Sequence, residues 1–176
     1  MISIVLLSCI AIVAIEIVIL IIVNKKNREM HDCIRAASNI ARDLQLEVML
    51  RNPYAPKQES EGAVDLRNFI CLTQIHSQIK HQYVYSLNSP ICIGRAKSNN
   101  QLILKDDLVS EYHCLIYLQQ DGVYLRDLNS ANGTVVKAGI KSFLVANGGS
   151  MMLQNDNILI IGTMEYKVKI FELEDF

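Results

Sequence analysis

The sequence lacks a strong net charge. Its 17 Lys and Arg residues nearly balance its 18 Asp and Glu residues, which leaves a formal net charge of −1. Proteins that bind nucleic acid usually present a basic field to the phosphate backbone. The charge balance therefore argues against nucleic acid as a partner.

The sequence also lacks paired cysteines. Cys9, Cys33, Cys71, Cys92 and Cys114 are odd in number and show no CxxC or CxxxC spacing. Disulfide frameworks and zinc sites usually need an even set or closely spaced pairs. We therefore expect free thiols in a reducing compartment, and we expect no metal or other cofactor.

Positive charge is missing before the apolar run at residues 2–23, whereas Lys25, Lys26 and Arg28 follow it directly. A cleaved signal peptide would need a positive n-region, a shorter apolar core and a small-residue cleavage site. A helix of this length rises about 33 Å, enough to cross a hydrocarbon core of about 30 Å. Because positive flanks favour the cytoplasm, the run predicts a single-pass anchor in the cell membrane, with its N-terminus outside and the rest of the chain cytoplasmic. Glu16 inside the run either meets a partner, stays protonated or reaches the interface in a tilted helix.

Residues 24–51 carry a helical pattern. Apolar residues recur at alternating spacings of four and three, at Met30, Ile34, Ala37, Ala41, Leu44 and Val48. This spacing predicts a juxtamembrane amphipathic helix, and over a short stretch it also fits a heptad seam. Self-association through residues 30–48, packing against the following domain and lying on the membrane remain three alternatives. Pro53 and Pro56 then end the helix and predict a linker at residues 52–64.

From residue 65 the sequence changes to short, often alternating runs separated by turn signals such as Asp121-Gly122 and Asn132-Gly133. The runs are Phe69–Thr73, Gln82–Ser86, Ile91–Ile93, Gln101–Leu104, His113–Leu118, Val123–Asp127, Thr134–Val136, Lys141–Leu144, Ser150–Leu153, Asn157–Ile161 and Tyr166–Glu172. Many short strands at such spacing predict an all-β antiparallel sandwich of about eleven strands over residues 65–172.

Three short motifs stand at the ends of these runs: Gly94-Arg95, Ser110-Glu-Tyr-His113 and Asn132-Gly-Thr134. An arginine fork grips a phosphate through two hydrogen bonds, and a hydroxyl and an amide add short directional bonds. A loop-built anion site on a β-scaffold would place such groups at strand ends. The order and spacing of the motifs resemble those of the forkhead-associated (FHA) domain, a module that binds phosphothreonine peptides. The resemblance covers residues 64–171.

The resemblance implies a role for each motif residue. Arg95 would be the main phosphate ligand, Ser110 would donate its hydroxyl to the phosphate, and Asn132 would hold the peptide backbone. The supporting residues would be His113, which braces the loops through hydrogen bonds, Gly94 and Gly133, which permit tight turns, and Thr134, which closes the last motif.

Two positions depart from the family pattern. Glu111 stands where a basic or amide side chain is frequent, and Ala131 stands where a hydroxyl donor is frequent. Losing one hydrogen bond to a charged group costs about 1.5–3 kcal/mol, so both positions are expected to lower affinity. Lys97 or Lys105 would offset part of this loss if either points into the site.

Other chemical interpretations of these residues are weaker. Ser110 and His113 as nucleophile and base would need an orienting acid, and neither flank supplies one. His76 and His81 lack further metal ligands. Residues 106–107, both Asp, predict a solvated loop; alternatively they repel acidic peptides and so shape specificity. Residues 148–149, both Gly, lack the sequence context of a nucleotide-binding loop and predict a turn.

Two non-enzymatic functions follow. In the first, a membrane-tethered adaptor recruits phosphothreonine-containing proteins to the cytoplasmic face of the membrane in Ser/Thr kinase signalling. In the second, a structural scaffold binds unphosphorylated partners, in a cell-envelope or division complex. Arg95, Ser110 and Asn132 favour the first, whereas Glu111 and Ala131 keep the second open.

Overall fold

The computed structural model describes the backbone of residues 2–51, 68–77, 79 and 81–173, and the side chains of the same residues except 2–11 and 44–51. The chain divides into two compact units, Met1–Ala36 and Ala37–Phe176. The described strands all belong to the second unit. The predicted linker at residues 52–64 lies outside the described residues.

The N-terminal helix α1 is one continuous element, Ile2–Arg51. We predicted separate helices at residues 2–23 and 24–51. No break separates them, because the polar stretch between them contains neither proline nor glycine, the residues that most disfavour a helix interior. In the predicted amphipathic segment, Ala37 and Ala41 are fully buried, whereas Arg35 and Arg42 are exposed. The side chains of residues 44 and 48 lie outside those described.

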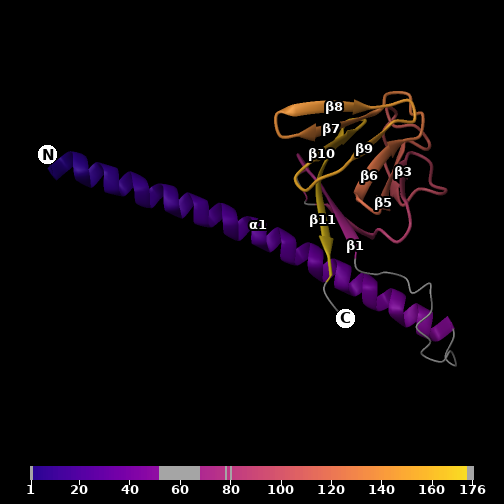
Figure 1. Cartoon of the computed structure of the whole chain (residues 1–176), viewed down its shortest axis with the longest axis horizontal. Coiled ribbons are helices and arrows are strands. Elements are labelled where there is room, and N and C mark those ends of the chain that lie inside the picture. Colours follow the sequence, from indigo (N-terminus) through magenta and orange to yellow (C-terminus); the bar gives the residue numbers. More distant parts are fainter. Residues whose placement is uncertain (1, 52–67, 78, 80, 174–176) are drawn as a thin grey trace. The chain divides into compact units, whose positions relative to one another are not determined.

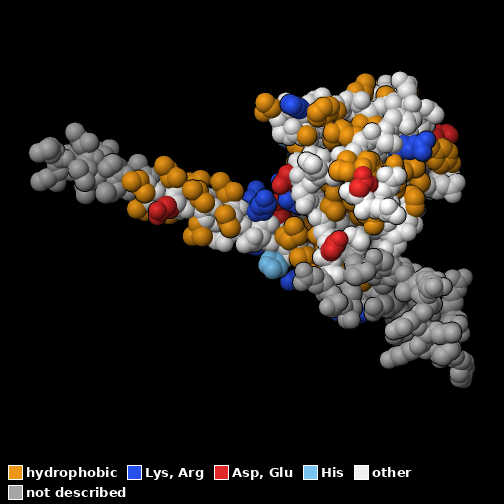
Figure 2. Space-filling model, in the orientation of Figure 1, with side chains coloured by type: hydrophobic (Ala, Val, Ile, Leu, Met, Phe, Trp, Pro, Cys, Tyr) orange, Lys and Arg blue, Asp and Glu red, His pale blue; other side chains and the backbone are white. Residues whose placement is uncertain are grey.

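The prediction of a transmembrane anchor is wrong. Within the part of the chain that the structure describes, no helix has an apolar stretch long enough to cross a membrane. The large apolar side chains described between Ile12 and Val23 are exposed on the surface of α1 (Figure 2). The predicted single-pass membrane localisation is therefore contradicted, and self-association through residues 30–48 gains no support.

The second unit contains a β-sandwich, as predicted, and its described residues form eleven strands in two sheets (Figure 1). The six-stranded sheet has the order β2 (Gln82–Ser86), β1 (Asn68–Gln74), β11 (Met164–Glu172), β10 (Ile158–Ile161), β7 (Thr134–Ala138) and β8 (Lys141–Val145). The five-stranded sheet has the order β4 (Leu102–Ile103), β3 (Ile91–Gly94), β5 (Cys114–Gln119), β6 (Gly122–Asp127) and β9 (Ser150–Met152). The recorded pairs are antiparallel except for β3 with β4.

The core lies between the two sheets. Alternate residues of β5 and β6, such as Ile116 and Leu125, are fully buried, and so are Leu159 of β10 and Val168 of β11. Successive side chains of a strand point to opposite faces, so this alternation gives each sheet one apolar inner face. The sequence pattern predicted this arrangement because its period of two is the period of a half-buried strand.

Strand register places the three motif loops at one end of the sandwich. Cys114, at the start of β5, pairs with Ile93 near the end of β3 and with Asp127 at the end of β6. Three loops therefore lie at the same end of the strands of the five-stranded sheet, at residues 95–101, 104–113 and 128–133.

Candidate functional site

Gly94 allows the first two loops to touch. A Cβ atom added at this position would lie 2.2 Å from the backbone oxygen of Glu111. The same oxygen accepts hydrogen bonds from the N–H of Ala96, at 3.1 Å, and from Nδ2 of Asn100, at 2.8 Å. A side chain at position 94 would push this backbone away, so the glycine is needed for close approach and not for an unusual φ.

Two predicted ligand residues, Arg95 and Asn132, bind the backbone of the segment that contains the third, Ser110. Nε of Arg95 donates to the carbonyl of Val109 at 3.1 Å, and the backbone N–H of Arg95 donates to the carbonyl of Ser110 at 2.9 Å. Nδ2 of Asn132 donates to the carbonyl of Leu108 at 2.8 Å. Arg95 and Asn132, which start in different loops, are thus held on consecutive peptide groups beside Ser110.

Each of these three side chains keeps hydrogen-bonding capacity for a ligand. Arg95 and Asn132 are exposed and Ser110 is half-buried. Ser110 Oγ accepts the backbone N–H of Ala131 at 3.0 Å, so its own hydrogen remains to be donated. Within the described part of the chain, no partner is recorded for the terminal NH₂ groups of Arg95. The backbone N–H of Ala131 thus orients the serine hydroxyl whatever side chain stands at position 131.

His113 joins the loops from inside the domain. Its imidazole is completely buried; Nδ1 accepts the N–H of Ser110 at 3.1 Å, and Nε2 lies 3.1 Å from the carbonyl of Gly133. Because Nδ1 accepts, Nε2 carries the proton and donates to Gly133. Its backbone also bonds to Ile93 and Leu128. Both ring nitrogens are occupied by backbone groups, so the imidazole is not hydrogen-bonded to the Ser110 hydroxyl as a catalytic base would be.

The third loop is built around Asp127 and Ser130, whose roles sequence reasoning did not identify. Both side chains are buried, and Ser130 Oγ donates to Asp127 Oδ1 at 2.5 Å. Ser130 Oγ then accepts the N–H of Gly133 at 2.9 Å, and Asp127 Oδ2 accepts the N–H of Ser130 and of Gly148. The spacing of Asp and Ser three residues apart is a local signal for such a turn.

Gly133 and Thr134 complete this loop. Gly133 has a φ of +70°, and an added Cβ would lie 2.8 Å from Leu144 and 2.9 Å from the carbonyl of Val145. Thr134 is fully buried beside Cys114, where burial raises the pKa of the thiol to about 12. Neither residue reaches the exposed face, so both support the loop from below.

Asn100 was also missed by sequence reasoning. It is buried, and Nδ2 donates to the carbonyls of Ala96 and Glu111 at 2.9 and 2.8 Å. It therefore ties the Arg95 loop to the Ser110 loop. Nothing in the local sequence distinguishes it from the neighbouring Asn99, because its partners are backbone carbonyls.

Residues 106–107 lie in a loop, as predicted, and the side chain of Asp106 is hydrogen-bonded there. Its Oδ2 accepts two hydrogen bonds of 2.7 Å, from the backbone N–H and the hydroxyl of Thr163, and Oδ1 accepts the N–H of Leu108 at 2.9 Å. The bonds from Thr163, followed by that from Leu108, lower the pKa of the Asp106 carboxyl. Asp107, in contrast, is exposed.

The predicted modulating charges lie on the surface. Lys97, Lys105 and Glu111 are all exposed. Among the described residues, Glu111 forms no ion pair with either lysine. The backbone of Glu111 is fixed by the bonds to its carbonyl, and its exposed side chain is adjacent in sequence to Ser110.

The other sequence motifs are not part of these loops, although the N–H of Gly148 donates to Asp127 of the third loop. His76 is exposed, 3.8 Å from a carboxylate oxygen of Glu165, which also pairs with Lys137 at 3.2 Å. Gly148 is in a turn with a φ of +75°, as the sequence predicted. Among the residues that the structure describes, no group of three or more His, Cys, Asp or Glu side chains is arranged to hold a metal ion.

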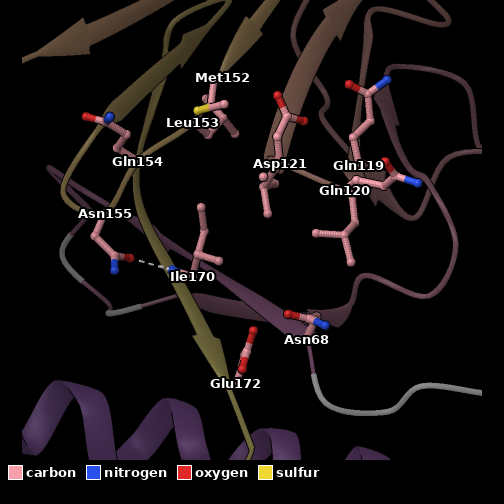
Figure 3. A pocket seen from close by; sticks show the side chains of 13 residues that line it. Asn68, Gln119, Gln120, Asp121, Met152, Leu153, Gln154, Asn155, Ile170 and Glu172 are labelled. Atoms are coloured by element: carbon pink, nitrogen blue, oxygen red, sulfur yellow. Dashed lines mark hydrogen bonds between the residues drawn. The ribbon is translucent and has the colours of Figure 1, made fainter.

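A hollow of about 590 Å³ lies at the opposite end of the sandwich from the motif loops. It is lined by the β5–β6 hairpin around Asp121, by Met152 at the end of β9, by Gln154, and by Ile170 and Glu172 of β11 (Figure 3). At its edge, Oδ1 of Asn155 accepts the backbone N–H of Ile170 at 2.6 Å. Its lining combines amide, apolar and two carboxylate side chains and contains no Lys or Arg, so its chemistry does not suit a phosphate.

Comparisons with known proteins bear on this geometry. Residues 91–162 match the sequence model of the FHA domain family. The NMR structure of the kinase-interacting FHA domain of kinase associated protein phosphatase from Arabidopsis is 27% identical with a TM-score of 0.50, and the match covers 62% of this chain and 98% of that one. The solution structure of the FHA domain of an Arabidopsis thaliana hypothetical protein is 19% identical with a TM-score of 0.50, and the match covers 69% and 98%.

A third structure, the FHA domain of a Chlamydia trachomatis protein, is 19% identical with a TM-score of 0.48, over 57% of this chain and 95% of that one. A search of curated proteins found no match. The matched residues 91–162 include all three motif loops. The family model thus matches the part of the sandwich that carries the motif loops, and the two Arabidopsis structures share the fold.

Proposed function

We propose that the motif loops bind phosphothreonine in partner proteins, and that the protein is an adaptor that recruits such partners in Ser/Thr kinase signalling. The observation that carries this proposal is that the side chains of Arg95 and Asn132 are held on the consecutive carbonyls of Val109 and Leu108, beside Ser110. The match of residues 91–162 to the FHA family model and the similarity to a domain described as kinase-interacting support it.

The chemistry of the three side chains fits a phosphopeptide. The exposed guanidinium of Arg95 offers its terminal N–H groups as a fork to two phosphate oxygens, and the Ser110 hydroxyl adds a short O–H···O⁻ bond. The Asn132 amide retains an acceptor oxygen and a second N–H, which together match the N–H and C=O groups of a peptide backbone. The loops hold these groups in place before binding, so little ordering cost remains.

The scaffold function remains the alternative, and the exposed carboxylate of Glu111 is the observation that favours it. A negative charge beside the site opposes a dianion, whereas it would not oppose an unphosphorylated peptide. Comparing the same peptides with and without phosphate separates the two functions.

The proposal is tested with a fluorescent peptide library that carries a fixed phosphothreonine and random flanking residues, and with its unphosphorylated counterpart. We expect the full chain to bind only the phosphorylated library. Arg95→Ala should lower its affinity at least tenfold, which corresponds to a charge-assisted hydrogen bond of about 1.4 kcal/mol or more. Arg126→Ala, which removes another exposed arginine from β6, is the matched control and should bind as the wild type does. Equal binding of both libraries would favour the scaffold function.

A further inference from the structure

The loop segment that carries the candidate ligand contacts is itself held by one carboxylate. Asp106 stands two residues before Leu108, and its side chain and backbone both bind this segment: Oδ1 accepts the N–H of Leu108, and its carbonyl accepts the N–H of Val109 at 3.0 Å. The carbonyls of Leu108 and Val109 are in turn the acceptors for Asn132 and Arg95. The direction of these two carbonyls therefore depends on Asp106.

Asp106 is anchored to a distant turn. Its Oδ2 accepts the backbone N–H and the hydroxyl of Thr163, in the turn between β10 and β11. This turn belongs to the six-stranded sheet, whereas the Arg95 loop follows β3 of the other sheet. The carboxylate thus fastens the ligand loop across the edge of the sandwich.

The neighbouring glycine is shaped for this contact. Gly162 has a φ of +62°, and an added Cβ would lie 2.5 Å from Oδ2 of Asp106 and 2.7 Å from the side chain of Val109. Only a residue without a side chain lets the carboxylate reach the Thr163 N–H. The turn and the loop are therefore fitted to each other at this point.

We propose that Asp106 is a positioning residue of the candidate phosphopeptide site: its bonds to Thr163 and Leu108 set the places of the Arg95 guanidinium and the Asn132 amide. This inference rests on the proposed function for its effect on affinity, but its effect on the loop is independent of any ligand. Asp106 itself faces Thr163 and not the exposed face, so it acts through the two side chains and does not contact the phosphate.

The first measurement uses NMR spectra of the ligand-free full chain. We expect Asp106→Ala to shift the Arg95 Nε–H and Asn132 Nδ2 signals and to speed their hydrogen exchange. Thr163→Val removes the hydroxyl bond and leaves the backbone bond, so it should shift the same signals by a smaller amount. Thr163→Ser keeps a hydroxyl and should give the same signals as the wild type. Asp107→Ala, which removes the adjacent exposed carboxylate, is the control and should leave both signals in place. Unchanged Arg95 and Asn132 signals in folded Asp106→Ala or Thr163→Val would overturn the proposal.

The second measurement is a double-mutant cycle of affinity for the phosphothreonine library. Asp106→Ala should weaken binding about tenfold in the wild type and clearly less in the Asn132→Ala background, because part of its effect passes through Asn132. The same loss in both backgrounds would contradict this route. If the wild type binds no phosphopeptide, the proposed function fails, and the ligand-free spectra alone decide whether Asp106 positions the loop.

Discussion

The Ser110 hydroxyl acts as an acceptor within the protein and keeps its donor for a ligand. Its oxygen accepts the Ala131 N–H, and its hydrogen remains to be donated toward the exposed face. The adjacent carboxylate of Glu111 is unfavourable for binding, because a phosphate is a dianion near neutral pH and like charges repel. At the scale of single residues, the site therefore contains complete donors next to one unfavourable charge.

Replacing Glu111 tests this balance. Glu111→Arg should tighten phosphopeptide binding about tenfold at low salt, and the gain should shrink as salt rises, because screening weakens exposed charges. Asp121→Arg makes the same charge change at the opposite end of the sandwich and should give little gain. Fluorescence titrations of both variants at two salt concentrations measure the effect. No gain for Glu111→Arg at either concentration would mean that this carboxylate does not limit affinity.

His113→Ala should reduce stability as well as binding. The buried imidazole satisfies the Ser110 N–H and the Gly133 carbonyl, and its removal leaves both groups unpaired around a cavity. We expect the free energy of unfolding to fall by about 2–4 kcal/mol, measured by chemical denaturation. A variant with wild-type stability but lost binding would show that His113 acts at the ligand and not through the fold.

At the scale of elements, each loop is closed by a different kind of contact. The Arg95 loop needs the bare backbone of Gly94, the Ser110 loop needs the Asp106 carboxylate, and the third loop needs Asp127 with Ser130. The strands between them supply a rigid edge through their ladder pairing.

The turn before β10 provides an electrostatic test at this scale. Oδ1 of Asp156 lies 2.8 Å from Nζ of Lys169 and 3.2 Å from Nζ of Lys167, and the hydrogen bond from Lys169 is the main cause that lowers the pKa of Asp156 from 3.8 to about 2. Because the folded pKa lies below the unfolded value, this contribution to stability is present above the unfolded pKa and is lost as the pH falls toward 2. The Asp156 side chain is 44% exposed, so solvent screening limits the contribution to about 1 kcal/mol.

Asp156→Asn should therefore lower the free energy of unfolding by about 1 kcal/mol at pH 7, and the difference from the wild type should vanish as the pH approaches 2. Asparagine also tolerates the φ of +68° at this position, so backbone strain is not introduced. Denaturation curves of both proteins at several pH values provide the measurement. A difference that stays constant across this range would rule out the ion pair as its cause.

At the scale of the whole molecule, the sandwich has two chemically different ends. The motif loops carry a positive guanidinium, a hydroxyl and an amide, whereas the hollow at the other end is lined by amide, apolar and two carboxylate side chains. Between the ends, the core buries Cys71 and Cys114 completely and leaves Cys92 half-buried. The described thiols therefore report on how tightly the sandwich is closed.

Thiol reactivity should follow this burial. In the native protein at pH 8, iodoacetamide should modify Cys92 much faster than Cys114, since burial removes access and raises the pKa of the Cys114 thiol to about 12. Added denaturant should bring the rate at Cys114 up as the sandwich unfolds. Mass spectrometry of the labelled peptides gives both rates. Equal rates at Cys92 and Cys114 without denaturant would mean that the closed sandwich opens easily in solution.

Hydropathy along the chain was a poor guide to the N-terminal segment. The apolar run at residues 2–23 met the length of a membrane span, yet the described helix has no stretch that qualifies and continues unbroken to Arg51.

The sequence by itself determined the sandwich and the order of its motifs. Strand alternation, turn residues such as Asp121-Gly122 and the three motifs are local signals, because each depends on residues within a few positions of one another. They predicted the two-layer fold with about eleven strands, and they identified Arg95, Ser110 and Asn132 as candidates that remain to be tested.

Only the tertiary structure decided how these candidates are held. Arg95 reaches Val109 over 14 positions, Asn132 reaches Leu108 over 24, and Thr163 reaches Asp106 over 57. Two of these acceptors are backbone carbonyls, which every residue carries, so no side-chain pattern could identify them. Asp106 and Asn100 gain their roles only when strand pairing brings distant loops to one edge, because a hydrogen bond depends on distance and direction in space and not on separation along the chain.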